Sequence, residues 1–269
     1  MNPIDIQSFS GVWKRTKLYK PRGCLGPEDE QTKTVLWFQT SKGIFIDVRV
    51  DPALAAESYN PLLLKSFAGV ATYDSSSQCI TWNREIDYRP TGAPDIGLIQ
   101  FLSNDEIEED GVLPGDDYKE IWRRVTKSDS TSDFVAKVTY QVEEGPSGST
   151  QFGYFIVLSD RFAFTLSKPQ ISDQDVTDAQ VEEFFNAQIP LSTNLENYLK
   201  QYIAVVGNAD TWLIDLSLDS ELVGQYILPT SCEQSPKFKI LFENIKWEIL
   251  DGCMPSALAD MLSHRCNNQ

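Results

Sequence analysis

The chain has 269 residues, a formal net charge of −16 and a hydrophobic content of 41%, which is the composition of a folded protein rather than a disordered one. So large a negative charge repels nucleic-acid phosphates and anionic lipids, and we therefore expect no nucleic acid and no membrane as partners. The five cysteines show no C-x-x-C spacing and the first residues do not resemble a signal peptide, which predicts a reduced, cytoplasmic protein.

The single histidine, His264, restricts the chemistry further. It lies near the end of a tail that we expect to be only loosely attached. Ser-His-Asp and Cys-His mechanisms and the usual catalytic zinc sites need a histidine inside a domain, so these classes are disfavoured. The chain also contains no Walker-A sequence and no Gly-x-Gly-x-x-Gly motif. We therefore predict no metal and no cofactor, and a chemistry of carboxylates, arginines and aromatic rings.

Taken in chain order, the predicted elements repeat. A strand, a polar loop and a tight hairpin occupy residues 12–49, and the same order returns over residues 134–166. Gly43 can take the left-handed conformation of the first turn, whereas Arg161 stands at that place in the second. The repeat predicts two related β-domains, residues 1–126 and 134–250, followed by a C-terminal extension, residues 251–269.

Short strands fill most of the remaining sequence, and helix signals are few. Helices are expected near residues 177–185 and 195–206, although residues 203–206 could equally form a strand. The acidic run at 105–117 is interpreted as a solvated loop rather than a metal site. Further strands are predicted at residues 79–88, 96–102, 118–125, 211–218, 222–228 and 238–250. This pattern favours an all-β fold of two antiparallel barrels with a few short helices, because closure removes exposed strand edges.

The first domain breaks the strand pattern with polar residues and is the candidate site, whereas the second alternates cleanly and is interpreted as mainly structural. Arg84 falls on the apolar face of its strand, beside Trp82. A buried arginine needs a carboxylate, carbonyl groups or an anionic ligand. Arg84 therefore either anchors a ligand or is structural, capping the barrel mouth or stacking on Trp13.

The first hairpin places Trp37 opposite Asp47, on one face with Arg49. Either this face is solvated, or it turns toward a cavity and the segment around residues 54–67 covers the opposite, more apolar face.

Another candidate is Glu120, which shares a strand face with Tyr118 and Trp122. A carboxyl among rings tends to have a raised pKa and suits a general acid, unless it pairs with Arg84 or Arg124. Further carboxylates at the predicted mouth come from Glu108 and Glu109. The candidate catalytic residues are Glu120, Asp87 and Arg84, and the candidate ligand-binding residues are Trp37, Asp47, Arg49, Trp82, Tyr118 and Trp122.

Several segments resemble a known family. Gly11-Val12-Trp13 is similar to the opening of lipocalin and calycin barrels. Residues 32–50, 81–122, 135–168 and 245–249 resemble the fungal casein-kinase-interacting protein family, which has two lipocalin-like barrels and bacterial relatives. The resemblance implies two calycin-like barrels, a cytosolic location and a protein-kinase partner. It implies no catalytic residues.

Three functions fit these observations. The first is binding of a small, largely apolar or aromatic molecule that carries an anionic or carbonyl group. The second is a cofactor-free isomerase, cyclase or lyase, with a carboxylate as acid or base and an arginine stabilising negative charge. The third is an acidic module that recruits basic protein partners. Full neutralisation of Arg84 in a filled cavity would contradict the first.

Overall fold

The structure, a computed structural model, describes residues 4–26, 33–51, 60–90, 94–128, 133–141, 149–169, 176, 178–187, 190–228 and 236–266. The chain divides into two compact units, residues 1–87 with 91–128 and residues 88–90 with 129–269. One unit is a closed antiparallel barrel and the other an antiparallel sheet, which confirms the all-β prediction. Within the described residues, no helix has the length and apolar character needed to cross a membrane.

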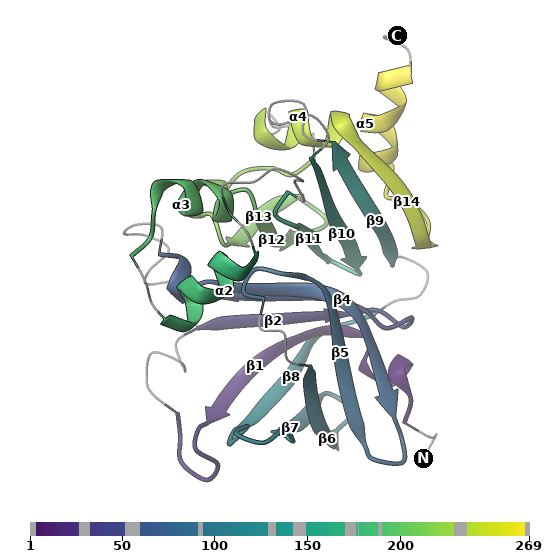
Figure 1. Cartoon of the computed structure of the whole chain (residues 1–269). Coiled ribbons are helices and arrows are strands. Elements are labelled where there is room, and N and C mark those ends of the chain that lie inside the picture. The colour runs from purple at the N-terminus through teal and green to yellow at the C-terminus, as the bar shows by residue number, and fades with distance from the viewer. Residues whose placement is uncertain are drawn as a thin grey trace. The chain divides into compact units, whose positions relative to one another are not determined.

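The first unit is an eight-stranded barrel in which each strand pairs with the next and the last returns to the first (Figure 1). Its strands are β1 (Gly11–Tyr19), β2 (Thr34–Gln39), β3 (Ile44–Val50), β4 (Lys65–Asp74), β5 (Cys79–Asp87), β6 (Asp95–Ser103), β7 (Glu106–Gly111) and β8 (Lys119–Lys127).

Local sequence explains two features of this barrel. Gly11 has φ +135°, and a Cβ there would lie 2.5 Å from the carbonyl oxygen of Thr126, so the close approach of β1 to β8 requires glycine. Gly43 has φ +86° in the β2–β3 turn, as predicted. The predicted pairing of Trp37 with Asp47 is confirmed.

One end of the barrel is apolar and closed. The 3-10 helix η1 (Ile6–Phe9) precedes β1 there, and Trp13 Nε1 donates to the carbonyl oxygen of Phe9 at 2.6 Å. Arg124 lies 4.4 Å above the Trp13 ring and donates to the carbonyl oxygens of Ser8 and Ser10 at 2.8 and 2.6 Å. The arginine that stacks on Trp13 is therefore Arg124, not Arg84.

The second unit contains a six-stranded antiparallel sheet in the order β13-β12-β11-β10-β9-β14. Its core cluster is entirely apolar and rich in phenylalanine, with Phe155 and Phe164 fully buried. The elements are β9 (Phe134–Gln141), β10 (Thr150–Leu158), β11 (Arg161–Leu166), α2 (Asp178–Ala187), α3 (Thr193–Leu199), β12 (Ile203–Asn208), β13 (Leu213–Ser217), η3 (Ser220–Leu222), α4 (Pro236–Asn244), β14 (Ile245–Gly252) and α5 (Ser256–Cys266).

Four local predictions were wrong. Residues 238–244 form helix α4 rather than a strand, and residues 222–228 form a turn with one isolated bridge, Leu213 to Tyr226. The acidic run contains strand β7 rather than only a solvated loop. The C-terminal residues are not loosely attached, because Leu258 of α5 is fully buried.

The segment around residues 54–67, one candidate to cover the apolar face of the first hairpin, contains η2 (Pro61–Leu63) and the start of β4, and residues 54–59 lie outside the described residues.

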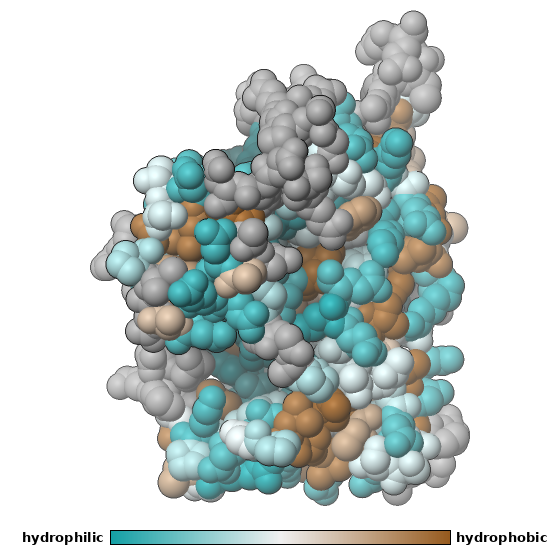
Figure 2. Space-filling model, viewed as in Figure 1, coloured by the Kyte–Doolittle hydropathy of each residue, from teal (hydrophilic) through white to brown (hydrophobic). Residues whose placement is uncertain are grey.

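The surface is mostly polar, as the net charge requires. Hydrophilic residues cover most of the face shown in Figure 2, and an apolar area lies over the part of the first unit where β5 and β6 lie in Figure 1. Leu98 and Leu102 are the exposed large apolar residues of β6.

Candidate functional site

The end of the barrel opposite to η1 gathers the polar residues. Arg49 lies near the end of β3, Phe67 near the start of β4, Asp87 at the end of β5 and Asp95 at the start of β6. Because neighbouring strands are antiparallel, these positions meet at one end of the barrel. We call this end the mouth.

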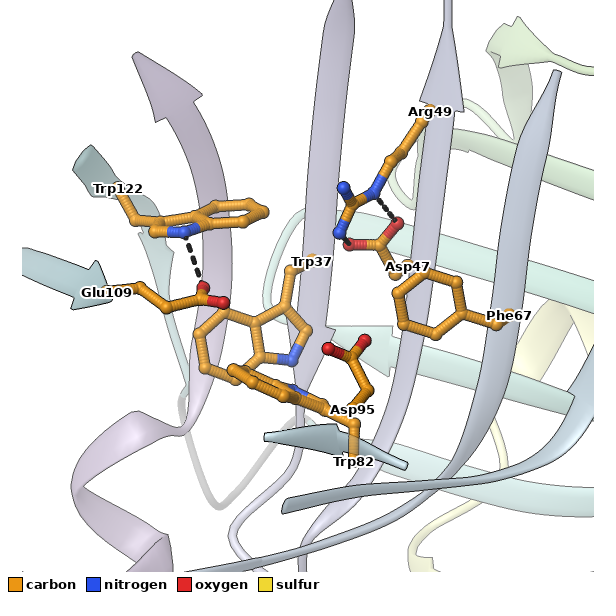
Figure 3. A pocket seen from close by; sticks show the side chains of 8 residues that line it. All are labelled: Trp37, Asp47, Arg49, Phe67, Trp82, Asp95, Glu109 and Trp122. Carbon is orange, nitrogen blue, oxygen red and sulfur yellow. Dashed lines mark hydrogen bonds and ion pairs between the residues drawn. The ribbon is translucent and has the colours of Figure 1, made fainter. Parts of the chain in front are cut away.

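A small pocket lies inside the mouth (Figure 3). It is lined by Trp37, Asp47, Arg49, Phe67, Trp82, Asp95, Glu109 and Trp122. The space amounts to about 220 Å³ when the part open to solvent is included, but the cavity volume is only about 10 Å³. That is the room for roughly one water molecule. In this structure the barrel interior is therefore almost filled.

Indole rings fill most of that interior. Trp82 and Trp122 both contact Trp37 nearly perpendicularly, with ring centroids 5.5 and 5.8 Å apart, and Trp13 stacks on it at 6.0 Å. The Trp37 Nε1 donates to Gln39 Oε1 at 3.1 Å, and the Trp122 Nε1 to Glu109 Oε2 at 2.9 Å. The indole N–H groups of Trp37 and Trp122 are thus already used, whereas Trp82 Nε1 has no hydrogen-bond acceptor among the described residues.

A chain of buried charges crosses the barrel from β1 to β3. Arg15 Nη1 lies 2.7 Å from Glu120 Oε1, and Arg49 Nη1 lies 3.9 Å from the same oxygen. Arg49 in turn donates to both oxygens of Asp47, at 2.7 and 3.3 Å. Arg15, Asp47 and Glu120 are each at most 7% exposed. Burial outweighs the neighbouring arginine and raises the pKa of Asp47.

Two carboxylates at the mouth neutralise Arg84. It pairs with Asp87 at 2.9 Å and with Asp95, and its guanidinium lies 3.9 Å from the centroid of the Phe67 ring. The structure therefore shows Arg84 as a paired, ring-stacked arginine. Asp95 uses only its Oδ2 for Arg84, and none of the described residues donates a hydrogen bond to its Oδ1.

The carboxyl with the most unusual environment is Glu109. It is 4% exposed, and it accepts hydrogen bonds from Tyr118 Oη at 3.0 Å and from Trp122 Nε1. Burial, with the negative charges of Glu120 and Asp95, raises its pKa well above the ordinary value. Glu109 is thus a carboxyl among rings whose pKa is raised, as suits a general acid.

Lys65 adds a further cation to the mouth, beside Arg49 and Arg84. Its Nζ lies 5.3 Å from the centroid of the Phe67 ring, on which Arg84 and Arg49 also lie. Burial and the two arginines lower the pKa of Lys65 to about 8.

The structure brings most of the predicted site residues together. Trp37, Asp47, Arg49, Trp82 and Trp122 line the pocket. The solvated interpretation of the hairpin face is wrong for Asp47, which is 3% exposed.

The other candidates lie around the pocket rather than in it. Glu120 pairs with Arg15 instead of Arg84 or Arg124, Asp87 pairs with Arg84, and Tyr118 donates to Glu109.

Two lining residues, Phe67 and Asp95, were missing from the predicted site, and Glu109 was predicted only as a carboxylate at the mouth. Alternation could have indicated that both carboxylates point inward, because Asp95 shares the inward face of β6 with Gly97 and Ile99, and Glu109 shares that of β7 with Ile107. Among the described residues, no three histidine, cysteine or carboxylate side chains are placed to hold a metal ion.

Comparison with known families gives one match. The family model described as Protein HRI1 matches residues 23–197, more than half of the chain. Searches of curated proteins and of solved structures give no match. The chain therefore belongs to the HRI1 family.

Proposed function

We propose that this member of the HRI1 family binds a small molecule in its first barrel, through the pocket at the mouth. The supporting observation is the charge buried there. Arg15, Asp47, Glu109 and Glu120 are each at most 7% exposed, in a barrel whose other end is filled with apolar side chains. Buried ion pairs rarely stabilise a fold more than apolar residues of the same volume would. Binding of a polar ligand would explain why these charged groups are buried, which a contribution to stability does not explain.

The arrangement of charges narrows the ligand proposed from the sequence. The condition set against an anionic or carbonyl ligand anchored by Arg84 is met, because Asp87 and Asp95 neutralise Arg84 and the barrel interior is almost filled. An anionic group would also have to compete with Asp47 for Arg49. A carbonyl group would find its donors at the remaining N–H groups of Arg49 and at Trp82 Nε1, which has no acceptor among the described residues. We therefore propose a compact polar head that is neutral or positively charged, carried on an apolar or aromatic body that contacts the indoles.

Native mass spectrometry of the protein purified from its own source, followed by denaturation, tests this proposal. We expect a small molecule released in stoichiometric amount. Asp95→Asn, in the pocket, should reduce its occupancy, while Asp105→Asn, at the opposite end of the barrel and 43% exposed at its side chain, should not. A wild-type protein without bound molecule, and without uptake from an extract of its source, would contradict the proposal.

A cofactor-free acid-base enzyme is the second candidate, and the environment of Glu109 favours it. A carboxylic acid that keeps its proton can act as a general acid on a molecule in the pocket. We expect Glu109-dependent incorporation of deuterium when small carbonyl compounds from an extract are incubated with the protein in D₂O. Equal incorporation by wild type and Glu109→Gln would refute this function.

The family resemblance also implies a protein-kinase partner, and the net charge of −16 suggests an acidic interaction module. Both stay predictions.

A further inference from the structure

The chemistry of the pocket wall selects the head group, if the proposed function holds. The cavity volume of about 10 Å³ suits one group the size of a water molecule, with any larger part of the ligand extending toward solvent. A primary ammonium group has this size. It carries three N–H donors and no acceptor.

The pocket wall keeps both donors and acceptors free. Trp37, Trp122 and two nitrogens of Arg49 already donate to protein oxygens, whereas Trp82 Nε1, Arg49 Nη1 and, beside the pocket, Arg84 Nε have no hydrogen-bond acceptor among the described residues. The acceptors that an ammonium group needs are the carboxylates, each of which can accept about four hydrogen bonds. Asp95 Oδ1 receives none from the described residues.

Two carboxylates, Asp47 and Asp95, and the Glu109 carboxyl group line the pocket with Arg49, while Arg84 pairs with Asp95 and Lys65 lies beside them. The aromatic surface favours a cation. Figure 3 shows the carboxylates of Asp47 and Asp95 turned toward the space beside the Trp37 indole, with Glu109 beneath Trp122. Indole faces attract cations by about 0.5–2 kcal/mol, depending on how far the cation is desolvated.

We propose that the pocket binds the primary ammonium group of a small amine, with Asp95 Oδ1 as its main acceptor, and that Glu109 loses its proton as the cation enters. The exchange balances: R–NH₃⁺ and the neutral Glu109 carboxylic acid give an R–NH₃⁺ carboxylate pair and one proton released to solvent. No covalent bond other than the O–H of Glu109 breaks.

The groups around Glu109 explain why a cation would release its proton. Glu120 and Tyr118 face it from β8 and the segment before it, Asp95 from β6, and Arg49 from β3. Burial and the two acidic neighbours keep Glu109 protonated, and Arg49 opposes them. A ligand cation adds a second opposing charge, so the affinity rises with pH while Glu109 is protonated in the free protein, by up to tenfold per pH unit.

Calorimetric titration of the full chain with benzylamine tests this inference. Benzyl alcohol and benzoate serve as neutral and anionic controls of similar shape. Titrations in phosphate and in HEPES separate the heat of proton release from the heat of binding. We expect benzylamine to bind at least about tenfold more tightly than either control, with release of about one proton.

Variants locate the effect. Glu109→Gln should abolish proton release and weaken benzylamine binding about tenfold. Asp95→Asn should weaken binding while proton release persists. Glu108→Gln, on the other face of β7 and paired with Lys119 at 2.5 Å, should change neither.

Several results would overturn the ammonium assignment. Equal or tighter binding of benzoate or benzyl alcohol would leave small-molecule binding intact and refute the head group. Benzylamine binding that neither pocket variant changes would place the amine elsewhere. Absence of benzylamine binding up to about 10 mM by correctly folded protein would refute the inference alone, since native mass spectrometry judges the proposed function independently.

Discussion

Replacing Arg15 by methionine tests whether the charged barrel interior stabilises the fold. The substitution keeps the length of the side chain and removes one partner of a buried ion pair at 2.7 Å. Glu120 then retains, among the described residues, only the Arg49 contact at 3.9 Å. Breaking a buried pair from one side costs about 3–5 kcal/mol. Because Arg49 remains, we expect the lower end, about 3 kcal/mol.

The double variant Arg15→Met/Glu120→Met removes both charges. It should cost less than the single variant and lie within about 1 kcal/mol of the wild type, because no uncompensated charge is left. An exposed pair of similar geometry provides the control: Arg161 lies 2.8 Å from Asp215, whose side chain is 43% exposed. Arg161→Met should cost less than about 1 kcal/mol.

Urea unfolding followed by tryptophan fluorescence measures these differences. Four of the six tryptophans, including Trp37 and Trp122, belong to the barrel, and Trp212 and Trp247 belong to the second unit. A cost below about 1 kcal/mol for Arg15→Met, or a double variant at least as unstable as the single one, would show that the pair is not an energetically isolated buried contact. The argument that these charges serve a ligand would then lose its basis.

Three further predictions concern other groups. In its folded state Glu109 keeps a proton that the unfolded chain releases near pH 4.5. The free energy of unfolding of the wild type should therefore fall as pH rises above that value, by up to about 1.4 kcal/mol per pH unit. Urea titrations between pH 5 and 7 should show a weaker dependence of this free energy on pH for Glu109→Gln, and an equal dependence would contradict the prediction. Lys65, with its pKa near 8, should be acylated at pH 8 faster than the exposed Lys14, as measured by peptide mass spectrometry. A slower rate would show that the contact with the Phe67 ring shields the Lys65 amine. Phe155→Ala should destabilise the second unit by about 3–5 kcal/mol without reducing ligand occupancy of the barrel. A loss of occupancy in folded protein would show that the second unit contributes to ligand binding.

The strand pairing of the hairpin was predictable because its determinants are local. The alternation of Trp37 and Asp47 and the left-handed Gly43 fix the register within a few residues. Helix α4 was missed because its apolar residues also suit a strand, although Phe238, Leu241 and Phe242 have the spacing of one helical face. Strand β7 was missed for the opposite reason: a carboxylate, Glu109, occupies one of its inward positions.

The partners of the site residues were not predictable from the sequence. Arg15 and Glu120 are 105 residues apart and meet only because β1 closes the barrel against β8, with register shifts on both sides of Arg15. Arg84 finds Asp95 across the loop between β5 and β6. Alternation can indicate that a charged residue points inward. The residue that neutralises it depends on closure and on irregular register, which local patterns do not contain.

The contrast between the two ends of the barrel is the strongest reason to infer a function for the mouth. At the closed end, Arg124 donates hydrogen bonds to backbone carbonyl groups and stacks on Trp13, and these contacts are typical of a structural arginine. At the mouth, Arg84 has two carboxylates, while one oxygen of Asp95 has no described donor and Glu109 is protonated by its surroundings. Single buried atoms without a hydrogen-bond partner occur at both ends, at Arg84 Nε and at Asp105 Oδ1, so the contrast rests on the number of charged groups gathered at the mouth. A donor that enters from solvent would complete the hydrogen bonds of Asp95.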